Sequence, residues 1–422
     1  MPTSSRLFTK GFLSLSLAQF FGAVNDNLLK GVLSFAVASN GLWSETLGKG
    51  GQAYVGFCLT IPFILLSGFA GQLADRTSKR SVTVRIKIAE VGIALVGFAG
   101  FFAGNLWLSL AALVLLAIQS SFFGPAKYGM IPELVDDSQL SQANGSINMF
   151  TNLAVIAGTL AAGPVYSLYH PDPGSSASPL LWVPGVAMLV IAALGFFTCL
   201  PIPRLKAMDP TLKINWNPFS LYLQTLRDMA GSHLLLVAFA WASFYMIGML
   251  AILILPDYRE LLDVSPTKAS VLLGILGVSI GIGSVSAGLI SGKHIEPRLI
   301  PVGALGMTVF FALLGLTPLD FNLVASLLFG AGIFAGFYIV PLQSLLQHLS
   351  PPDERGRFLG TANALSFVTA SLGSLAFLIS KAMFHLASNQ IFLICAGLAL
   401  VGSGFLIWPL RRLITDPSLR GR

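Results

Sequence analysis

Apolar stretches long enough to cross a bilayer recur along the whole chain and constrain its fold more than any other feature. Hydrophobic residues make up 55% of the 422 residues and charged residues 10%, where soluble domains carry ~25% charged residues. Twelve stretches have the length of about 20 residues that a membrane-spanning helix needs. They lie at roughly 12–38, 52–74, 82–103, 106–126, 146–169, 181–200, 234–256, 268–290, 299–318, 321–347, 359–384 and 390–410. The sequence therefore predicts an all-α, multi-pass membrane protein.

Basic residues are distributed unevenly over the predicted loops. One side of the membrane receives 20 Lys and Arg residues and the other receives 4, while Lys30 lies inside a span. Because cytoplasmic loops are enriched in Lys and Arg, this asymmetry predicts twelve spans with both termini in the cytoplasm. The same asymmetry accounts for the net charge of +7 without a nucleic-acid partner.

The longest predicted loop divides the chain nearly in half. We expect a six-helix bundle over residues 1–200, a cytoplasmic linker over 201–233 and a second six-helix bundle over 234–422. The halves repeat each other at near-equal offsets. The matching pairs are Gly71 and Gly288, Pro125 and Pro341, and Asn144 and Asn363, at offsets of 217, 216 and 219 residues. Such repeats are typical of transporters that bind substrate between two bundles near the membrane midplane.

The linker contains a predicted amphipathic helix. Asn217 and Pro218 offer an N-cap followed by proline at the first helical position. Apolar residues then recur at helical spacing, at Phe219, Tyr222, Leu223 and Leu226. Its position favours a strap between the two halves, and the alternative is a regulatory or lipid-sensing element on the cytoplasmic surface.

The first predicted span carries charged residues near its centre. Asp26 and Lys30 are four residues apart, so on a helix they share one face. A charge in hydrocarbon costs at least ~2.5–3.5 kcal/mol, and such groups usually face a polar pathway or a partner. This polar feature points to transport. The alternative is that Asp26 and Lys30 only neutralise each other to permit insertion.

Other polar residues predict no cofactor and no metal. The three cysteines, Cys58, Cys199 and Cys395, and the five histidines have no metal-ligand spacing. The Gly-Ile-Gly run at 281–283 follows no strand and precedes no phosphate-binding lysine, so no ATP site is expected. Glu90 is expected to serve the framework by pairing with a nearby basic residue, either Arg85 or Lys87.

The loop after the second span carries a family signature. Residues 71–80 read Gly-Gln-Leu-Ala-Asp-Arg-Thr-Ser-Lys-Arg. This run resembles the G-x-L-A-D-R-x-G-R-[KR] motif of the major facilitator superfamily, with Ser78 where the last glycine is usual. The resemblance implies the major facilitator fold of two six-helix bundles and alternating access. It also implies that this loop clasps the halves in the outward-facing state, through Gly71, Asp75, Arg76 and Arg80.

Four further stretches resemble the lysophospholipid transporter branch of this superfamily. They lie at 19–27, 121–134, 143–145 and 336–343, and the Pro-Ala-Lys-Tyr-Gly run at 125–129 is the most specific. The resemblance implies a flippase, not an enzyme, that moves lysophosphatidylethanolamine-type lipids across the bacterial inner membrane to the cytoplasmic leaflet for reacylation. It implies the lipid bilayer and a separate cytosolic-side acyltransferase/acyl-ACP synthetase as partners, and we expect a monomer.

The polar residues can be matched to such a substrate, whose head group carries an ammonium and a phosphate. Asp26 could accept the ammonium, and Lys30 or Lys127 could bind the phosphate through a charge-assisted hydrogen bond. Lys127 could instead snorkel at the end of the fourth span. Further substrate contacts are expected from Asn25, Asn27, Gln119, Tyr338 and Gln343.

Other classes of function are alternatives. An ion-coupled exporter of drugs or small metabolites would commonly carry an arginine in the fourth span, where this chain has Gln119 and no arginine. An intramembrane enzyme needs a nucleophile with an activating base, and no Ser-His or Cys-His set is identifiable by spacing. A purely structural partner for an acyltransferase fits the sequence but leaves Asp26 no purpose beyond pairing.

Overall fold

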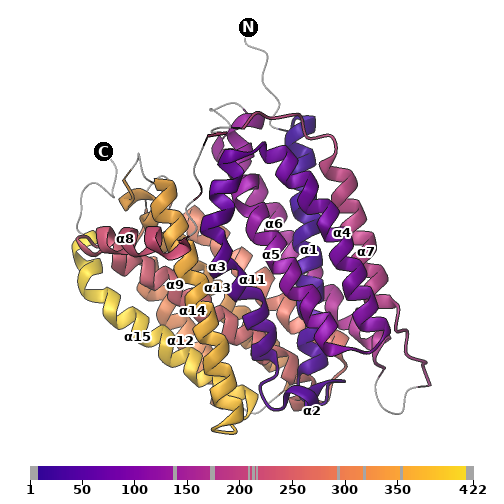
Figure 1. The fold of residues 1–422 in the computed structure, drawn as a ribbon. Helices are drawn as coiled ribbons and strands as arrows, with labels where there is room; N and C mark the ends of the chain where they lie inside the picture. The colour runs from indigo at the N-terminus through magenta and orange to yellow at the C-terminus, as the bar shows by residue number, and fades with distance from the viewer. Residues whose placement is uncertain are drawn as a thin grey trace. The chain divides into compact units, whose positions relative to one another are not determined.

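The computed structural model is built of helices (Figure 1). It describes residues 8–135, 140–171, 176–207, 210–211, 214, 217–291, 295–316, 320–351 and 355–414. Within these ranges twelve helices have 17 or more residues, one for each predicted span, and no strand occurs. The predicted all-α fold with twelve spanning helices is therefore confirmed.

The long helices follow the order of the predicted spans. They are α1 (Lys10–Val37), α3 (Gln52–Arg76), α4 (Lys79–Phe102), α5 (Leu106–Leu134), α6 (Leu140–Tyr169), α7 (Val183–Cys199), α9 (Leu234–Ile254), α11 (Pro266–Ser291), α12 (Leu299–Leu316), α13 (Phe321–Leu349), α14 (Arg355–Ala382) and α15 (Ser388–Ile414). The short helices are α2 (Ser44–Leu47), α8 (Pro218–Ala230), η2 (Leu255–Asp257) and α10 (Tyr258–Leu261). The linker thus contains the predicted amphipathic helix, as α8.

Composition separates the long helices into groups. Eight described helices contain an 18-residue window apolar enough to cross a membrane, judged by length and composition. The helices α7 and α15 contribute shorter described apolar stretches, at Val183–Cys199 and Ser388–Gly402. The helices α1 and α4 are in neither group. They carry charged residues inside their predicted spans, and contacts with other helices must compensate for these charges because lipid does not solvate them.

Packing groups the chain into two compact units. Unit 1 comprises Met1–Ala36 and Pro62–Phe219, and unit 2 comprises Val37–Ile61 and Ser220–Arg422. The boundary between Phe219 and Ser220 falls inside the predicted linker. In addition, the C-terminal end of α1, all of α2 and the first part of α3 pack with unit 2, although they precede the predicted boundary at residue 200. The three predicted domain ranges stay a prediction.

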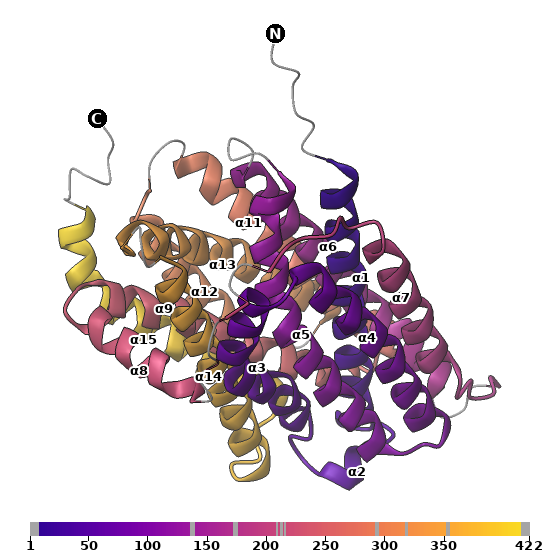
Figure 2. The same cartoon turned by 45° about the horizontal axis from the view of Figure 1, so that its top comes forward.

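Small residues let helices approach closely within each unit. In unit 1, α4 packs against both α5 and α7, and α4 and α7 run side by side in Figures 1 and 2. A Cβ on Gly158 of α6 would lie 2.5 Å from the backbone carbonyl oxygen of Val24 in α1. In unit 2, α13 packs against α9, α11 and α12, and a Cβ on Gly336 of α13 would overlap the backbone of Gly283 in α11. Close contacts through small residues are typical of helices that associate in a membrane.

A buried carboxylate explains why residues 37–61 belong to unit 2. Asp257, at the end of η2, is 2% exposed. It accepts hydrogen bonds from the backbone N–H of Ser39 at 3.1 Å, from the hydroxyl of Ser388 at 2.5 Å and from the side-chain amide of Gln52. The ammonium of Lys381 lies 2.9 Å from the same carboxylate. One acid thus joins the segment after α1 and the start of α3 to α14 and α15.

We expect Asp257→Ala to lower the free energy of unfolding by about 3–5 kcal/mol, because removing one partner leaves a buried charge uncompensated. Thermal or denaturant unfolding of the purified protein in detergent measures the change. Glu260→Gln is the matched control, since Glu260 is exposed on the adjacent helix α10 and should change stability by less than about 0.5 kcal/mol. Equal stabilities of the two variants would show that the carboxylate does not hold this end of unit 2.

Candidate functional site

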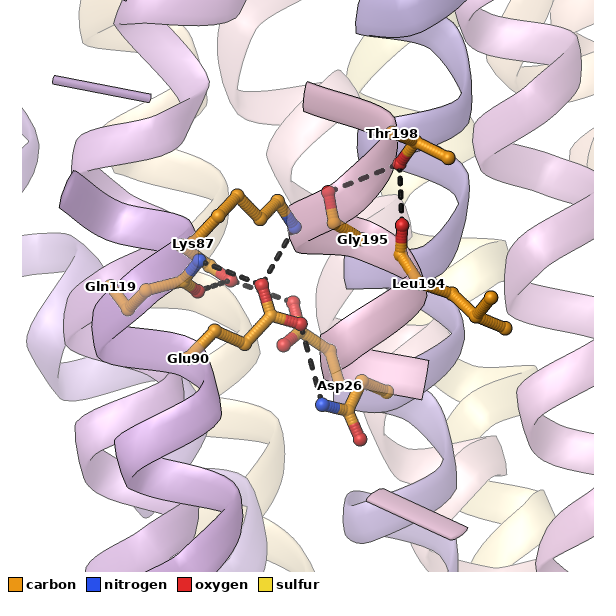
Figure 3. Close-up of polar contacts among 9 residues, drawn as sticks. Asp26, Lys87, Glu90, Gln119, Leu194, Gly195 and Thr198 are labelled. Atoms are coloured by element: carbon orange, nitrogen blue, oxygen red, sulfur yellow. Dashed lines mark hydrogen bonds and ion pairs between the residues drawn. The ribbon is translucent and has the colours of Figure 1, made fainter. Parts of the chain in front are cut away.

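An ion pair inside α4 forms the centre of the polar region of unit 1 (Figure 3). The ammonium of Lys87 and the carboxylate of Glu90 are 2.6 Å apart, and their side chains are 0% and 1% exposed. Desolvating each ion costs several kcal/mol, which the mutual attraction offsets only when further hydrogen bonds satisfy both groups. The pair therefore requires polar partners from neighbouring helices.

Neighbouring helices supply these partners. Asn25 of α1 donates to Oε1 of Glu90 at 3.3 Å, and Gln119 of α5 donates to Oε2 at 3.2 Å. The absence of a side chain at Gly22 leaves room for the ammonium of Lys87, because a Cβ there would lie 2.6 Å from Nζ. Two of the predicted substrate contacts, Asn25 and Gln119, thus bind Glu90 of the ion pair in this structure.

Asp26 follows Asn25 on α1 but has a different environment. Its Oδ2 accepts a hydrogen bond from the hydroxyl of Ser120 at 2.7 Å. Its Oδ1 is buried and has no hydrogen-bond partner among the described residues. Lys30 donates to Oδ1 of Asn27 at 2.8 Å instead of forming an ion pair with Asp26. The alternative in which Asp26 and Lys30 only neutralise each other therefore has no direct ion pair in this structure.

Lys127 lies in the C-terminal part of α5 and is 6% exposed. Its ammonium is 4.3 Å from the centroid of the Tyr128 ring, within the range of a cation–π interaction. No carboxylate of the described part of the chain forms an ion pair with it. Its burial disfavours the snorkelling alternative, and Lys127 retains the capacity to bind an anion.

The two predicted residues of the second half lie on α13 in unit 2. Tyr338 is 2% exposed, and its hydroxyl donates to the backbone carbonyl of Ala240 in α9 at 3.1 Å. This hydroxyl therefore serves the packing of α13 against α9. Gln343 is exposed on the same helix, and its role as a substrate contact stays a prediction.

The predicted clasp residues lie at the end of α3 and the start of α4. Arg80 donates to two backbone carbonyl oxygens just after α7, at 2.6 and 3.3 Å, and so fixes that chain end within unit 1. Arg76 is exposed. A Cβ on Gly71 would meet no atom of the described residues within 4 Å. The side chain of Asp75 lies outside the described residues, and the clasp stays a prediction.

Sequence reasoning assigned Glu90 to the framework and did not single out Ser120. The pairing with Lys87 was one of two expected alternatives, and the spacing of three residues inside one span is its signal, since such residues are neighbours on a helix. Ser120 has no comparable signal, because serines are common in the predicted spans. Its contact with Asp26 joins α5 to α1 and depends on the tertiary packing.

The ion pair generates a prediction for a double-mutant cycle. We expect Glu90→Gln alone to destabilise the protein by about 3–5 kcal/mol, because the Lys87 ammonium loses its buried counter-charge. The variant carrying both Lys87→Met and Glu90→Gln should be more stable than Glu90→Gln alone. Thermal unfolding of the wild type, both single variants and the double variant measures the coupling, and additive losses would contradict it.

Comparisons with known proteins identify the family. A sequence model of the Major Facilitator Superfamily matches residues 15–374. Proteins called lysophospholipid transporter LplT are similar in sequence: that of Serratia proteamaculans is 27% identical over 376 residues, covering 87% of this chain and 86% of the relative. That of Cronobacter sakazakii is 28% identical over 370 residues, covering 85% and 84%.

Solved structures are similar in fold. A crystal structure of a D-xylose-proton symporter matches with a TM-score of 0.71 and 18% identity, over 94% of this chain and 97% of that chain. An inward-facing, unoccupied bacterial homologue of the human lysosomal transporter Spinster matches with a TM-score of 0.73 and 14% identity, over 97% and 98%. The chain therefore belongs to the Major Facilitator Superfamily and is a multi-pass membrane transporter, not an enzyme.

Proposed function

We propose that this protein is a flippase that moves lysophosphatidylethanolamine-type lipids across the bacterial inner membrane to the cytoplasmic leaflet by alternating access. The names of the relatives from Serratia proteamaculans and Cronobacter sakazakii support the substrate class. In this proposal both termini are cytoplasmic, the protein acts as a monomer, and a separate cytosolic-side acyltransferase or acyl-ACP synthetase consumes the delivered lipid.

The observation that carries the proposal is the buried, unpartnered Oδ1 of Asp26. A buried acceptor without a donor costs about 1–3 kcal/mol, and more when it is charged. This cost favours a functional role for Asp26 over a structural one. Lys30 does not supply the missing donor, because it bonds to Asn27. An ammonium group of a ligand would supply both the donor and the opposite charge, and Ser120 holds the other oxygen of Asp26 in place.

Three lysines of unit 1 differ in whether they are available to bind the phosphate of the lipid head group. Lys87 is neutralised by Glu90 and does not compete for a ligand. Lys30 and Lys127 have no carboxylate ion-pair partner among the described residues. Each can therefore donate to a phosphate through a charge-assisted hydrogen bond. A head group with one ammonium and one phosphate complements the carboxylate of Asp26 and the ammonium of either Lys30 or Lys127.

We expect Asp26→Asn to lower kcat/KM for lysophosphatidylethanolamine by about 10–100-fold, because a hydrogen bond to a charged group contributes about 1.5–3 kcal/mol. Uptake of the labelled lipid into proteoliposomes measures the change, with size-exclusion profiles to verify folding. Normal uptake by the variant would reduce Asp26 to a framework residue. Absence of uptake by the folded wild type would favour the exporter of drugs or small metabolites.

Two adjacent serines on α5 separate a positioning role from a general packing effect. Ser120 donates to Asp26, whereas the hydroxyl of Ser121 donates to the backbone carbonyl of Ile118 at 2.7 Å. Loss of one hydrogen bond of about 1 kcal/mol should make Ser120→Ala about five-fold slower in uptake and leave Ser121→Ala close to the wild type. Combined with Asp26→Asn, Ser120→Ala should have little further effect. Equal effects of the two serine variants would contradict the positioning role.

A further inference from the structure

The position of α8 places it at the membrane surface. Its last residue, Ala230, is followed after three residues by Leu234, the first residue of the membrane-spanning helix α9. This connection can extend over at most about 14 Å. The side chain of Asn217 caps the other end by accepting a hydrogen bond from the backbone N–H of Phe219 at 3.1 Å. A capped helix of 13 residues is thus held beside the point where α9 enters the bilayer.

An ion pair attaches α8 to a second spanning helix. The guanidinium of Arg357, in the first turn of α14, lies 2.7 Å from the carboxylate of Asp228. Figure 1 shows α8 lying across the direction of α14. A helix that lies crosswise at the ends of spanning helices has the orientation of an interfacial helix, whose axis follows the membrane plane.

The helix has a buried sector and a separate exposed sector that carries apolar side chains. Thr225 and Met229 are 0% exposed and face the interior of unit 2. Phe219 and Leu223 are 44% and 56% exposed, and their spacing of four residues places them on one face. This face is separate from the buried one, so packing among the described residues leaves it open. Arg227 follows Leu223 by four residues and is exposed as well.

We propose that α8 docks on the lipid surface at the start of α9, with Phe219 and Leu223 among the acyl chains and Arg227 against anionic head groups. Full burial of a Phe or Leu side chain contributes about 1.5–3 kcal/mol, and a basic residue near an anionic leaflet contributes about 1 kcal/mol. The bilayer is within the reach of the connection to α9. Charge complementarity and proximity therefore select lipid as the occupant of this face.

Site-directed spin labelling tests this docking without reference to the transported substrate. Leu223→Cys and Gln224→Cys form a matched pair, because both residues are exposed and adjacent on α8 but point about 100° apart. Only Cys58→Ser is needed as background, since Cys199 and Cys395 are 0% exposed. The labelled full chain is reconstituted into vesicles of phosphatidylethanolamine and phosphatidylglycerol.

The label at Leu223 should collide with oxygen several-fold more often than with a water-soluble nickel chelate, and the label at Gln224 should show the reverse preference. Exposure of both labels to the nickel chelate would overturn the docking and leave α8 as a strap. Protection of the Leu223 label from both reagents would overturn it in favour of a protein partner. If Leu223→Cys misfolds, Phe219→Cys replaces it, and the same preference for oxygen is required.

Discussion

The ion pair between Lys87 and Glu90 is the interaction on which the polar interior of unit 1 depends. Neither charge can be solvated by lipid, so protein groups must complete the coordination of both. Asn25 and Gln119 do this for Glu90, and their hydrogen bonds fix α1 and α5 relative to α4. The two charges of the framework are therefore paired before any ligand binds, although the side-chain oxygen of Asn25 is buried without a hydrogen-bond partner among the described residues.

This framework determines the setting of Asp26. Successive residues on a helix point about 100° apart, so Asp26 makes a different hydrogen bond from Asn25, while it stays within electrostatic reach of both Lys87 and Glu90. The hydroxyl of Ser120 donates to one oxygen of Asp26, and the second oxygen has no hydrogen-bond donor among the described residues. The distinction between a satisfied pair and an unsatisfied acid is the basis for assigning one to structure and the other to the substrate.

Length and apolarity were sufficient to predict the helices, because a membrane-spanning helix satisfies its own backbone whatever its neighbours are. Side-chain partners were harder to predict. The spacing of Asp26 and Lys30 shows that they can meet, but Asn27 is also within reach of Lys30 and takes its hydrogen bond. Sequence spacing gives the possible neighbours on one helix and does not decide among them.

Contacts between distant segments had no sequence signal at all. The grouping of residues 37–61 with unit 2 depends on Asp257, which lies more than 200 positions from Ser39 and Gln52 in the sequence. Lys87 and Lys127 lie near the ends of the predicted spans 82–103 and 106–126 and belong to the 20 basic residues of the richer side, yet both are buried. The predicted topology tolerates the misplacement of two residues because it depends on the sum over many basic residues. A predicted site depends on a few residues, so one misplaced residue changes it.

The central claim is that Asp26 recognises the ammonium of the transported lipid, and a binding cycle between protein and ligand tests it most directly. Affinities of the wild type and Asp26→Asn are measured for lysophosphatidylethanolamine and for lysophosphatidylglycerol, which lacks the ammonium. The account predicts that the substitution weakens binding of the ethanolamine lipid about ten-fold or more, equivalent to about 1.4 kcal/mol, with little change for the glycerol lipid. Equal losses for both lipids would contradict the claim.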